Sequence, residues 1–253
     1  MERVIAIANQ KGGVGKTTTV VNLGAGLANL GHRVGVIDLD SQGALTISLG
    51  LDPYKINPST YNLLLDSNLH VEDIFHEVRP NLYLAPANAE LIAAEYRLMK
   101  KSDRTLRLRN ALQRSQIELD FILIDTPPAL SLLTVNGLVA ATELLIPVSS
   151  NYLAMRGVRS LLDSVWLIRE RINPDLKLLG VLPTLVQSNT SHAKSAIAEM
   201  QTVFKNKVFR TFIPSDEIAA MAPAIRKAAV DYKPESAVAV AYQQLAKEVS
   251  HAK

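Results

Sequence analysis

Short apolar runs rich in β-branched residues alternate with helix-length segments along this chain, and this alternation is the strongest constraint on its fold. Runs that are apolar on both faces are typical of parallel strands that helices cover on each side. Seven such runs are present, at residues 3–8, 33–38, 82–86, 120–125, 143–148, 176–183 and 207–214. Helical patterns occupy residues 17–30, 89–113, 152–172 and 191–204. The alternation predicts an α/β fold, with a single doubly wound, mostly parallel sheet and helices on both faces.

The alternation extends over the whole sequence, without an internal repeat, a low-complexity tract or a linker. We therefore expect residues 1–253 to form one domain. Residues 51–80 interrupt the pattern, and we expect an excursion of short helices and loops there.

The composition narrows the possible classes of protein. No cysteine is present, which excludes disulfides, thiolate zinc sites and iron–sulfur clusters. An apolar run begins almost at Met1 and leaves no room for a signal peptide, and the longest unbroken apolar run, residues 237–242, is too short to span a bilayer. We expect a cytoplasmic protein, whose net charge of +3 mildly favours an anionic partner.

The stretch NQKGGVGKTT, residues 9–18, follows the first apolar run and opens the first helical pattern. Backbone N–H groups and a helix dipole can meet a phosphate anion at such a position. Glycines would let the backbone wrap around the phosphates, Lys16 would neutralise β/γ charge and the Thr17 hydroxyl would ligate Mg²⁺. The strict motif G-x-x-x-x-G-K-[ST] is not met, because Gln10 replaces its first glycine, and a second lysine, Lys11, is present. The alternative is a glycine turn with incidental lysines. We predict that this loop binds the phosphates of a nucleotide.

Two other apolar runs end in carboxylates that should lie beside this loop. The sequence VIDLDSQG places Asp38 and Asp40 after the second run. A carboxylate there could orient and polarise the water that attacks a γ-phosphate, although strand-end loop charges are the alternative. The sequence FILIDTPP ends a buried run in Asp125, a Walker B pattern, and this carboxylate could hold Mg²⁺ through water.

With these motifs the chain resembles the deviant Walker A ATPases of the ParA/Soj and MinD type. The resemblance implies that Lys11 reaches across an ATP-sandwich homodimer to the partner's phosphates, while Lys16 serves its own nucleotide. The implied ATP-binding residues of the loop are Lys11, Gly12, Gly13, Val14, Gly15, Lys16, Thr17 and Thr18. It also implies that Asp40 orients the catalytic water and contacts Mg²⁺ through water, although Ser41 replaces the proline usual in the family. The expected activity is slow, partner-stimulated, Mg²⁺-dependent ATP hydrolysis, with Lys11, Lys16 and Asp40 as catalytic residues.

The base pocket of the family lies at the end of a late strand, where this chain has FIPSDE. The resemblance implies adenine contacts by Pro214 and by Asp216, which stands where asparagine is usual. For Pro214, a strand terminator is the alternative.

ParA-like proteins bind DNA non-specifically, which requires a basic surface. Seven basic residues and one acid lie between residues 97 and 114, and on one helix four of them would share a stripe: Arg97, Lys101, Arg104 and Arg107. The other candidates are Arg156, Arg159, Lys205, Lys207, Arg210, Arg226 and Lys227. A solvated surface is the alternative. Residues 215–218, with the sequence SDEI, stand where chromosomal family members carry arginines.

The resemblance implies an ATPase that segregates or positions chromosome or plasmid DNA, or another large cargo. The implied partners are nucleoid DNA and a ParB-like or other stimulating protein. A MinD-like regulator of cell division on a membrane surface is the alternative. It is disfavoured because the last helical pattern, AVAVAYQQLAKEV, resembles a core-packing element and only SHAK follows. A metabolic or cofactor-assembly ATPase is a third possibility.

Overall fold

The computed structural model describes residues 3–150, 154–187 and 190–252, without the side chains of residues 154–157. Within these residues the strands form one seven-stranded sheet in the order β3-β4-β2-β5-β1-β6-β7. Neighbouring strands are parallel except for the antiparallel pair of β3 and β4. The strands are β1 Arg3–Ile7, β2 Val34–Asp38, β3 His76–Arg79, β4 Leu82–Ala85, β5 Phe121–Asp125, β6 Glu143–Ser149 and β7 Lys177–Thr184.

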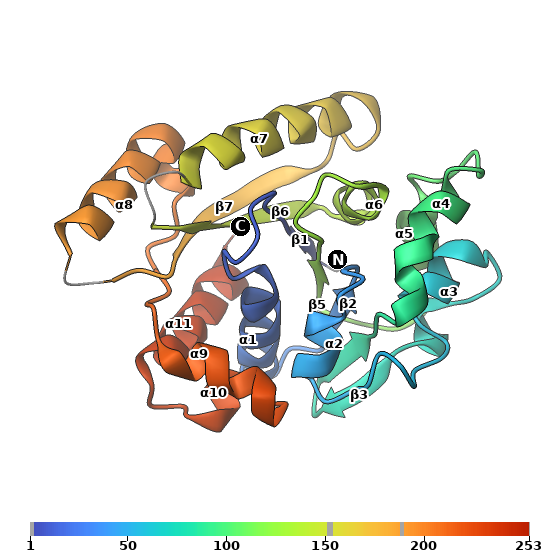
Figure 1. The fold of residues 1–253 in the computed structure, drawn as a ribbon, viewed down its shortest axis with the longest axis horizontal. Helices are drawn as coiled ribbons and strands as arrows, with labels where there is room; N and C mark the ends of the chain where they lie inside the picture. Colours follow the sequence, from blue (N-terminus) through green and yellow to red (C-terminus); the bar gives the residue numbers. More distant parts are fainter. Residues whose placement is uncertain (1–2, 151–153, 188–189, 253) are drawn as a thin grey trace.

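Helices cover both faces of this sheet, which confirms the predicted fold class (Figure 1). The longer helices are α1 Lys16–Asn29, α6 Leu132–Ala140, α7 Ala154–Arg171, α8 Ser191–Phe204 and α11 Ala237–His251. The shorter ones are α2 Ala44–Ser48, α3 Thr60–Leu65, α4 Ala94–Leu98, α5 Arg107–Gln113, α9 Glu217–Met221 and α10 Ala229–Tyr232. Four 3₁₀ turns are described, η1 Val71–Asp73, η2 Ala89–Ala93, η3 Lys205–Lys207 and η4 Ala222–Ile225.

The two faces bury alternate side chains of the same strands. In β1, Ile5 and Ile7 pack in the core beneath α1, α10 and α11, while Val4 and Ala6 pack in the core beneath α3 to α7. Side chains of a strand point alternately to its two faces, so a strand covered on both sides must be apolar throughout. This requirement explains the unbroken apolar runs of the sequence.

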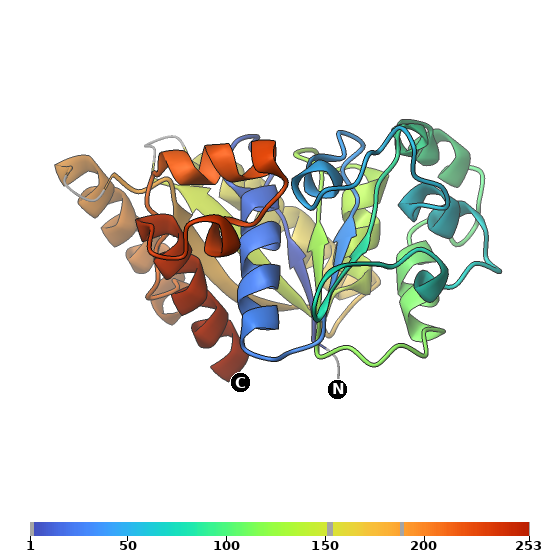
Figure 2. The ribbon, with the colours of Figure 1, turned by 90° about the horizontal axis from the view of Figure 1, so that it is seen from below.

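The sheet order reverses at β1, which lies between β5 and β6. In open α/β sheets a crevice forms at the carboxyl ends of the strands at such a switch point, because successive helices leave toward opposite faces. The loop from β1 to α1 therefore opens into this crevice. Helix α9 and η4 lie near the start of α1, α10 packs against its middle at Asn22, and α11 runs beside it (Figure 2).

Three details differ from the sequence prediction. Residues 51–80 contain the strand β3 in addition to short helices. The last apolar run, 207–214, is not a strand and forms only isolated bridges to the β7 side, Val181 with Val208 and Val186 with Pro214. Five residues separate the first members of these bridges and six separate the second, so a regular ladder cannot stay in register.

The third difference concerns the pattern at residues 89–113, which is not one helix but η2, α4 and α5 with turns between them. Turns separate α4 from α5, and Leu98 and Leu108, on either side of them, are both buried in the same core. The predicted helix starting at residue 152 begins within residues outside the description, and α7 is described from Ala154.

Candidate phosphate-binding site

The loop between β1 and α1 has the backbone of a phosphate cradle. Gly13 and Gly15 adopt positive φ angles of 68° and 85°, which non-glycine residues rarely adopt. The side chain of Asn9 holds the base of the loop, because its Nδ2 donates to the carbonyl of Pro147 at 2.7 Å and its Oδ1 accepts from the backbone N of Lys11 at 3.0 Å. The loop is thus shaped before any ligand binds.

Lys16, the first residue of α1, is only 7% exposed. Its Nζ donates to the carbonyl of Lys11 at 3.4 Å. Burial lowers the pKa of Lys16, and the nearby carboxylates of Asp125 and Asp40 oppose that shift. A buried ammonium group in such a loop, with one weak hydrogen bond from its Nζ, is suited to a phosphate anion.

Asp125 ends β5 directly beside the start of α1. The Thr17 hydroxyl donates to Oδ2 of Asp125 at 2.7 Å, while Oδ1 is buried and has no hydrogen-bond partner among the described residues. Burial, followed by the charge of Asp38, raises the pKa of Asp125 well above its ordinary value, and the Thr17 hydrogen bond opposes this. A divalent cation would supply the missing positive charge, and hydroxyl and carboxylate oxygens are the ligands that Mg²⁺ prefers. The residues therefore fit an Mg²⁺ held by Thr17 and, through water, by Asp125.

The two carboxylates after β2 have different surroundings. Asp38 is fully buried, and its side chain accepts hydrogen bonds from the backbone N of Asp40 and from both the N and Oγ1 of Thr46. Burial raises the pKa of Asp38 to about 6, although these hydrogen bonds lower it. Asp38 thus fastens β2 to α2, which is a structural role.

Asp40 is partly exposed, and its Oδ1 accepts from the backbone N of Gln42 at 3.0 Å. Its charge acts on both Lys16 and Asp125. Asp40 therefore lies in the electrostatic field of the site and remains accessible to water, as a carboxylate that orients a nucleophilic water must be. Its catalytic role stays a prediction.

Lys11 is also partly exposed, at the outer part of the loop beside the exposed Gly12 and Gly13. Among the described residues, only the backbone N and O of Lys11 take part in hydrogen bonds of the loop, so its side chain is free to serve a ligand or another subunit. Whether it reaches a partner's phosphates stays a prediction.

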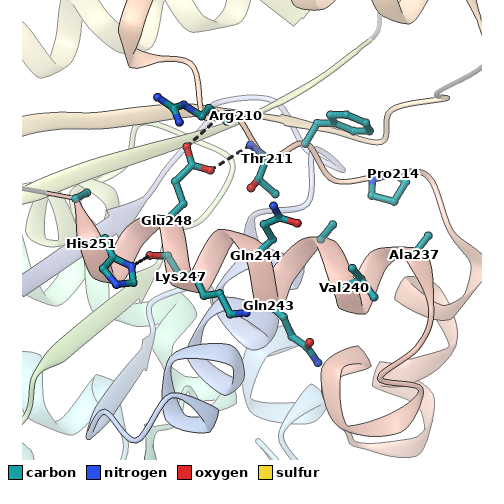
Figure 3. A pocket seen from close by; sticks show the side chains of 13 residues that line it. Arg210, Thr211, Pro214, Ala237, Val240, Gln243, Gln244, Lys247, Glu248 and His251 are labelled. Atoms are coloured by element: carbon teal, nitrogen blue, oxygen red, sulfur yellow. Dashed lines mark hydrogen bonds between the residues drawn. The ribbon is translucent and has the colours of Figure 1, made fainter.

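The two residues expected around adenine are placed differently. Asp216 caps α9 by accepting from the N of Ile218 at 2.9 Å, and its other oxygen accepts from the N of Val238 at 3.3 Å. The carboxylate that was expected to read adenine therefore also holds α9 and the start of α11 together. Pro214 lies on the wall of an open groove of about 1180 Å³ (Figure 3).

That groove runs along α11, away from the phosphate loop. Among the residues that line it, both oxygens of Glu248 accept from backbone N–H groups, those of Arg210 and Thr211 (Figure 3). A smaller cavity of about 200 Å³ lies beside Thr17 and Thr18, with further walls from α2, α9 and η4. Of these two hollows, the smaller one adjoins the residues that follow the phosphate loop.

The basic residues expected to share one stripe do not do so. Arg107 is buried at 8% exposure, with Nε donating to the carbonyl of Leu64 at 2.7 Å and Nη1 to Asp103 at 3.0 Å. The expectation that Arg107 lies on an exposed basic face is therefore wrong, because α4 ends at Leu98 and α5 places this arginine inward.

The other basic candidates keep some access to solvent. Arg97 stacks over the Tyr61 ring at 5.6 Å, and Lys101 is partly exposed. The side chain of Arg156 lies outside the described residues. The exposed candidates are Arg97, Arg104, Arg159, Lys205, Lys207, Arg210, Arg226 and Lys227.

Comparisons with known proteins agree with this geometry. A family model described as an AAA domain matches residues 2–178. The sporulation initiation inhibitor protein Soj of Bacillus subtilis is 40% identical over 250 residues, which cover 99% of each chain. The chromosome-partitioning ATPase Soj of Thermus thermophilus is 41% identical over 98% of this chain and 95% of its own. The chain belongs to the ParA/Soj family.

Two similar proteins have been solved with a nucleotide and magnesium bound. A protein described as cobyrinic acid a,c-diamide synthase from Mycobacterium smegmatis, with bound ADP and magnesium, is 38% identical, with a TM-score of 0.86 over 98% of this chain and 93% of that one. The septum site-determining protein MinD of Pyrococcus horikoshii, complexed with Mg-ADP, is 25% identical, with a TM-score of 0.79 over 99% and 97% of the two chains.

Some side chains that shape the ParA/Soj site could not be identified from the sequence. Thr46 holds Asp38, and its Oγ1 also accepts from the N of Ala87. Thr184, at the end of β7, donates to the carbonyl of Val14 in the phosphate loop at 2.8 Å. No local pattern marks either threonine, since each acts on a segment distant in the chain. Asn9 could have been noticed, because it immediately precedes the loop.

Proposed function

We propose that this chain binds Mg²⁺ and ATP in the β1–α1 loop and hydrolyses ATP slowly, as one P-loop ATPase domain spanning residues 1–253. The observation that carries this proposal is the buried Lys16 beside the Thr17–Asp125 hydrogen bond, in a glycine loop already shaped for phosphate. Backbone N–H groups and Lys16 bind the phosphates, and Thr17 and Asp125 hold the cation. When bound, the cation neutralises phosphate charge. Asp40 orients the attacking water.

The proposed ATPase forms a homodimer around two nucleotides, with Lys11 serving the nucleotide of the partner. The partly exposed position of Lys11 supports this, as does the identity of about 40% to Soj proteins over nearly the full length. A cation supplied in trans makes dimerisation depend on ATP and stabilises charge during phosphoryl transfer.

The output of the ATP switch is proposed to be segregation or positioning of chromosome or plasmid DNA, or of another large cargo. In the ATP state the dimer binds DNA non-specifically through its exposed basic residues, and a ParB-like protein stimulates hydrolysis. The proposed location is the cytoplasm, in association with the nucleoid. Chromosome-partitioning relatives support this output.

One experiment addresses the switch and its output together. Retardation of unspecific duplex DNA is compared with ATP and with ADP, and repeated at raised salt. ATP-dependent retardation that weakens steeply with salt is expected, because phosphate contacts release counterions. Equal retardation with both nucleotides, or none with either, would exclude a DNA-binding ATP switch.

Two other functions have an observation in their favour. Structural similarity to MinD favours a regulator on a membrane surface, although no described helix has the length and apolar character needed to cross a bilayer. ATP-dependent co-sedimentation with liposomes that is lost on deletion of α11 would support that function. Similarity to the protein described as a diamide synthase favours a metabolic ATPase, in which a small substrate but not DNA stimulates turnover.

A further inference from the structure

Two consecutive carbonyl groups of the phosphate loop are held by buried hydroxyls. The Val14 carbonyl accepts from Oγ1 of Thr184 at 2.8 Å. The next carbonyl, of Gly15, accepts from both Oγ1 and N of Thr19, at 2.7 and 2.9 Å. Both threonines are buried, at 1% and 0% exposure. The two carbonyls are therefore held by hydrogen bonds from Thr184 at the end of β7 and from Thr19 in α1.

These bonds determine where the following N–H groups point. In a planar trans peptide the C=O and the next N–H point in opposite directions. Because the Val14 carbonyl points toward Thr184, the Gly15 N–H points away from Thr184. Because the Gly15 carbonyl points toward Thr19, the Lys16 N–H points away from Thr19. Neither N–H has an acceptor among the residues that the structure describes. Both are available to a phosphate at the start of α1.

A third hydroxyl extends this arrangement to the last helix. The Tyr242 hydroxyl, on α11, lies 3.2 Å from Oγ1 of Thr19. The single hydroxyl hydrogen of Thr19 is used in its bond to Gly15, so Tyr242 must donate to Thr19. Tyr242 is 1% exposed, and burial raises the pKa of Tyr242, so that its hydroxyl keeps its proton. Tyr242 thus donates to Thr19, and Thr19 donates to the carbonyl of Gly15.

We propose that Thr184 and Tyr242 are positioning residues of the phosphate loop. From β7 and α11 they fix the two peptide planes that follow Val14 and Gly15, and so aim the N–H groups of Gly15 and Lys16 at the phosphates before a nucleotide arrives. A cradle ordered in advance binds more tightly, since less order must be created on binding. This inference rests on the proposed function, that the loop binds nucleotide phosphates.

The test measures dissociation constants of Mg-ADP and of Mg-pyrophosphate by calorimetry, for the full chain and its variants. Thr184→Val and Tyr242→Phe each remove one hydroxyl and keep the shape of the side chain. We expect each to raise both dissociation constants by about five- to tenfold, the effect of one buried hydrogen bond. Pyrophosphate is included because it contacts only the phosphate loop. Thr184→Ser, which retains the hydroxyl, should bind as the wild type does.

A matched control is Tyr232→Phe, which removes a hydroxyl from an exposed tyrosine on α10 and should change nothing. The melting temperature of every variant is measured, and binding is studied well below it. If Tyr242→Phe does not fold, Thr19→Val interrupts the same hydroxyl chain and Thr19→Ser restores it.

The possible results separate this inference from the function on which it rests. Variants with a lowered melting temperature but unchanged dissociation constants would mean that the hydroxyls are only structural, and would overturn the inference while the ATPase proposal stands. A wild-type protein that binds neither ADP nor pyrophosphate would overturn both.

Discussion

The Thr17 hydroxyl and the Asp125 carboxylate are joined by a 2.7 Å hydrogen bond, and the second oxygen of Asp125 is buried without a partner among the described residues. This pair brings together the first turn of α1 and the end of β5, which are 108 residues apart in the chain. The oxygens of this pair fit a divalent cation.

Removal of the Thr17 hydroxyl should therefore reduce the dependence of nucleotide binding on Mg²⁺. We expect Thr17→Val to weaken Mg-ATP binding about tenfold or more, because a cation ligand and the donor to Asp125 are both lost. Binding measured with EDTA should change little. Titration calorimetry with and without Mg²⁺ measures this difference. Thr17→Ser is the control, and an equal loss of affinity in both conditions would argue against a cation site.

Substitutions of the two lysines of the loop should have different effects on nucleotide binding and dimerisation. Lys16→Ala should abolish nucleotide binding, because the buried ammonium group is the main positive charge facing the phosphates. Lys11→Ala should bind ATP nearly as the wild type does but should not dimerise in response to it. Light scattering after gel filtration, with ATP and with ADP, reads out the dimer. An ATP-dependent dimer of normal stability in Lys11→Ala would refute the role in trans.

Asp40 should be needed for hydrolysis but not for binding. We expect Asp40→Ala to lower turnover at least about a hundredfold, since a group that orients and polarises the nucleophile typically contributes that much. ATP should still drive dimerisation, and the dimer should persist longer because hydrolysis no longer ends it. Phosphate release and dimer lifetime are measured on the same sample. A variant with normal turnover would remove Asp40 from the mechanism.

Stability near Asp38 should depend on pH in a predictable direction. The pKa of Asp38 is about 6 in the folded chain, above the ordinary value of 3.8, so the folded state holds the extra proton between these values. The contribution of this residue to the free energy of unfolding is therefore present at low pH and is lost as pH rises toward 6.

Thr46→Val removes a hydroxyl that favours the ionised form of Asp38. The variant should lose about 1.5–3 kcal/mol of unfolding free energy at pH 7, where Asp38 is ionised, and less at pH 4.5, where it is protonated. Urea unfolding at the two pH values measures the difference. Thr46→Ser, which keeps the hydroxyl, is the control, and an equal loss at both pH values would contradict the assignment.

Substitutions of the basic residues between 97 and 114 should affect either DNA binding or folding stability, depending on whether the side chain is exposed or buried. Arg104→Ala removes an exposed charge, and if this surface holds DNA it should weaken binding and reduce the slope of log K against log salt by about 0.9. Arg107→Ala should instead cost about 2 kcal/mol of stability, because the carbonyl of Leu64 loses its buried donor. Filter binding across a salt series and chemical unfolding distinguish the groups. An unchanged salt slope in Arg104→Ala would place the DNA surface elsewhere.

Much of the site could be predicted from the sequence because its residues act near their own position in the chain. Lys16 and Thr17 follow a glycine loop at a strand–helix junction, and the backbone geometry of such a junction is local. Asp125 ends an apolar run, and parallel strands bring their carboxyl ends to one edge of the sheet. The ParA/Soj resemblance, now confirmed, also came from these local motifs.

The basic stripe could not be predicted in the same way. A helical wheel assumes that one helix continues, yet turns separate α4 from α5 in the structure. Arg107 then turns inward, where the Leu64 carbonyl and Asp103 offset the cost of its burial. Tertiary packing therefore determines that Arg107 is buried and not exposed.

The sequence by itself determined the alternation of strands and helices, the phosphate loop and the strand-end carboxylates, since each depends on the period of apolar residues or on a few adjacent positions. Only the tertiary structure decided which hydroxyls hold that loop, which aspartate is buried and which arginines face solvent. Thr184 and Tyr242 lie 170 and 227 residues after Val14 and Gly15 in the chain, and such contacts depend on how strands and helices pack together. Packing brings elements together regardless of their separation in sequence, so these contacts cannot be predicted from a local sequence pattern.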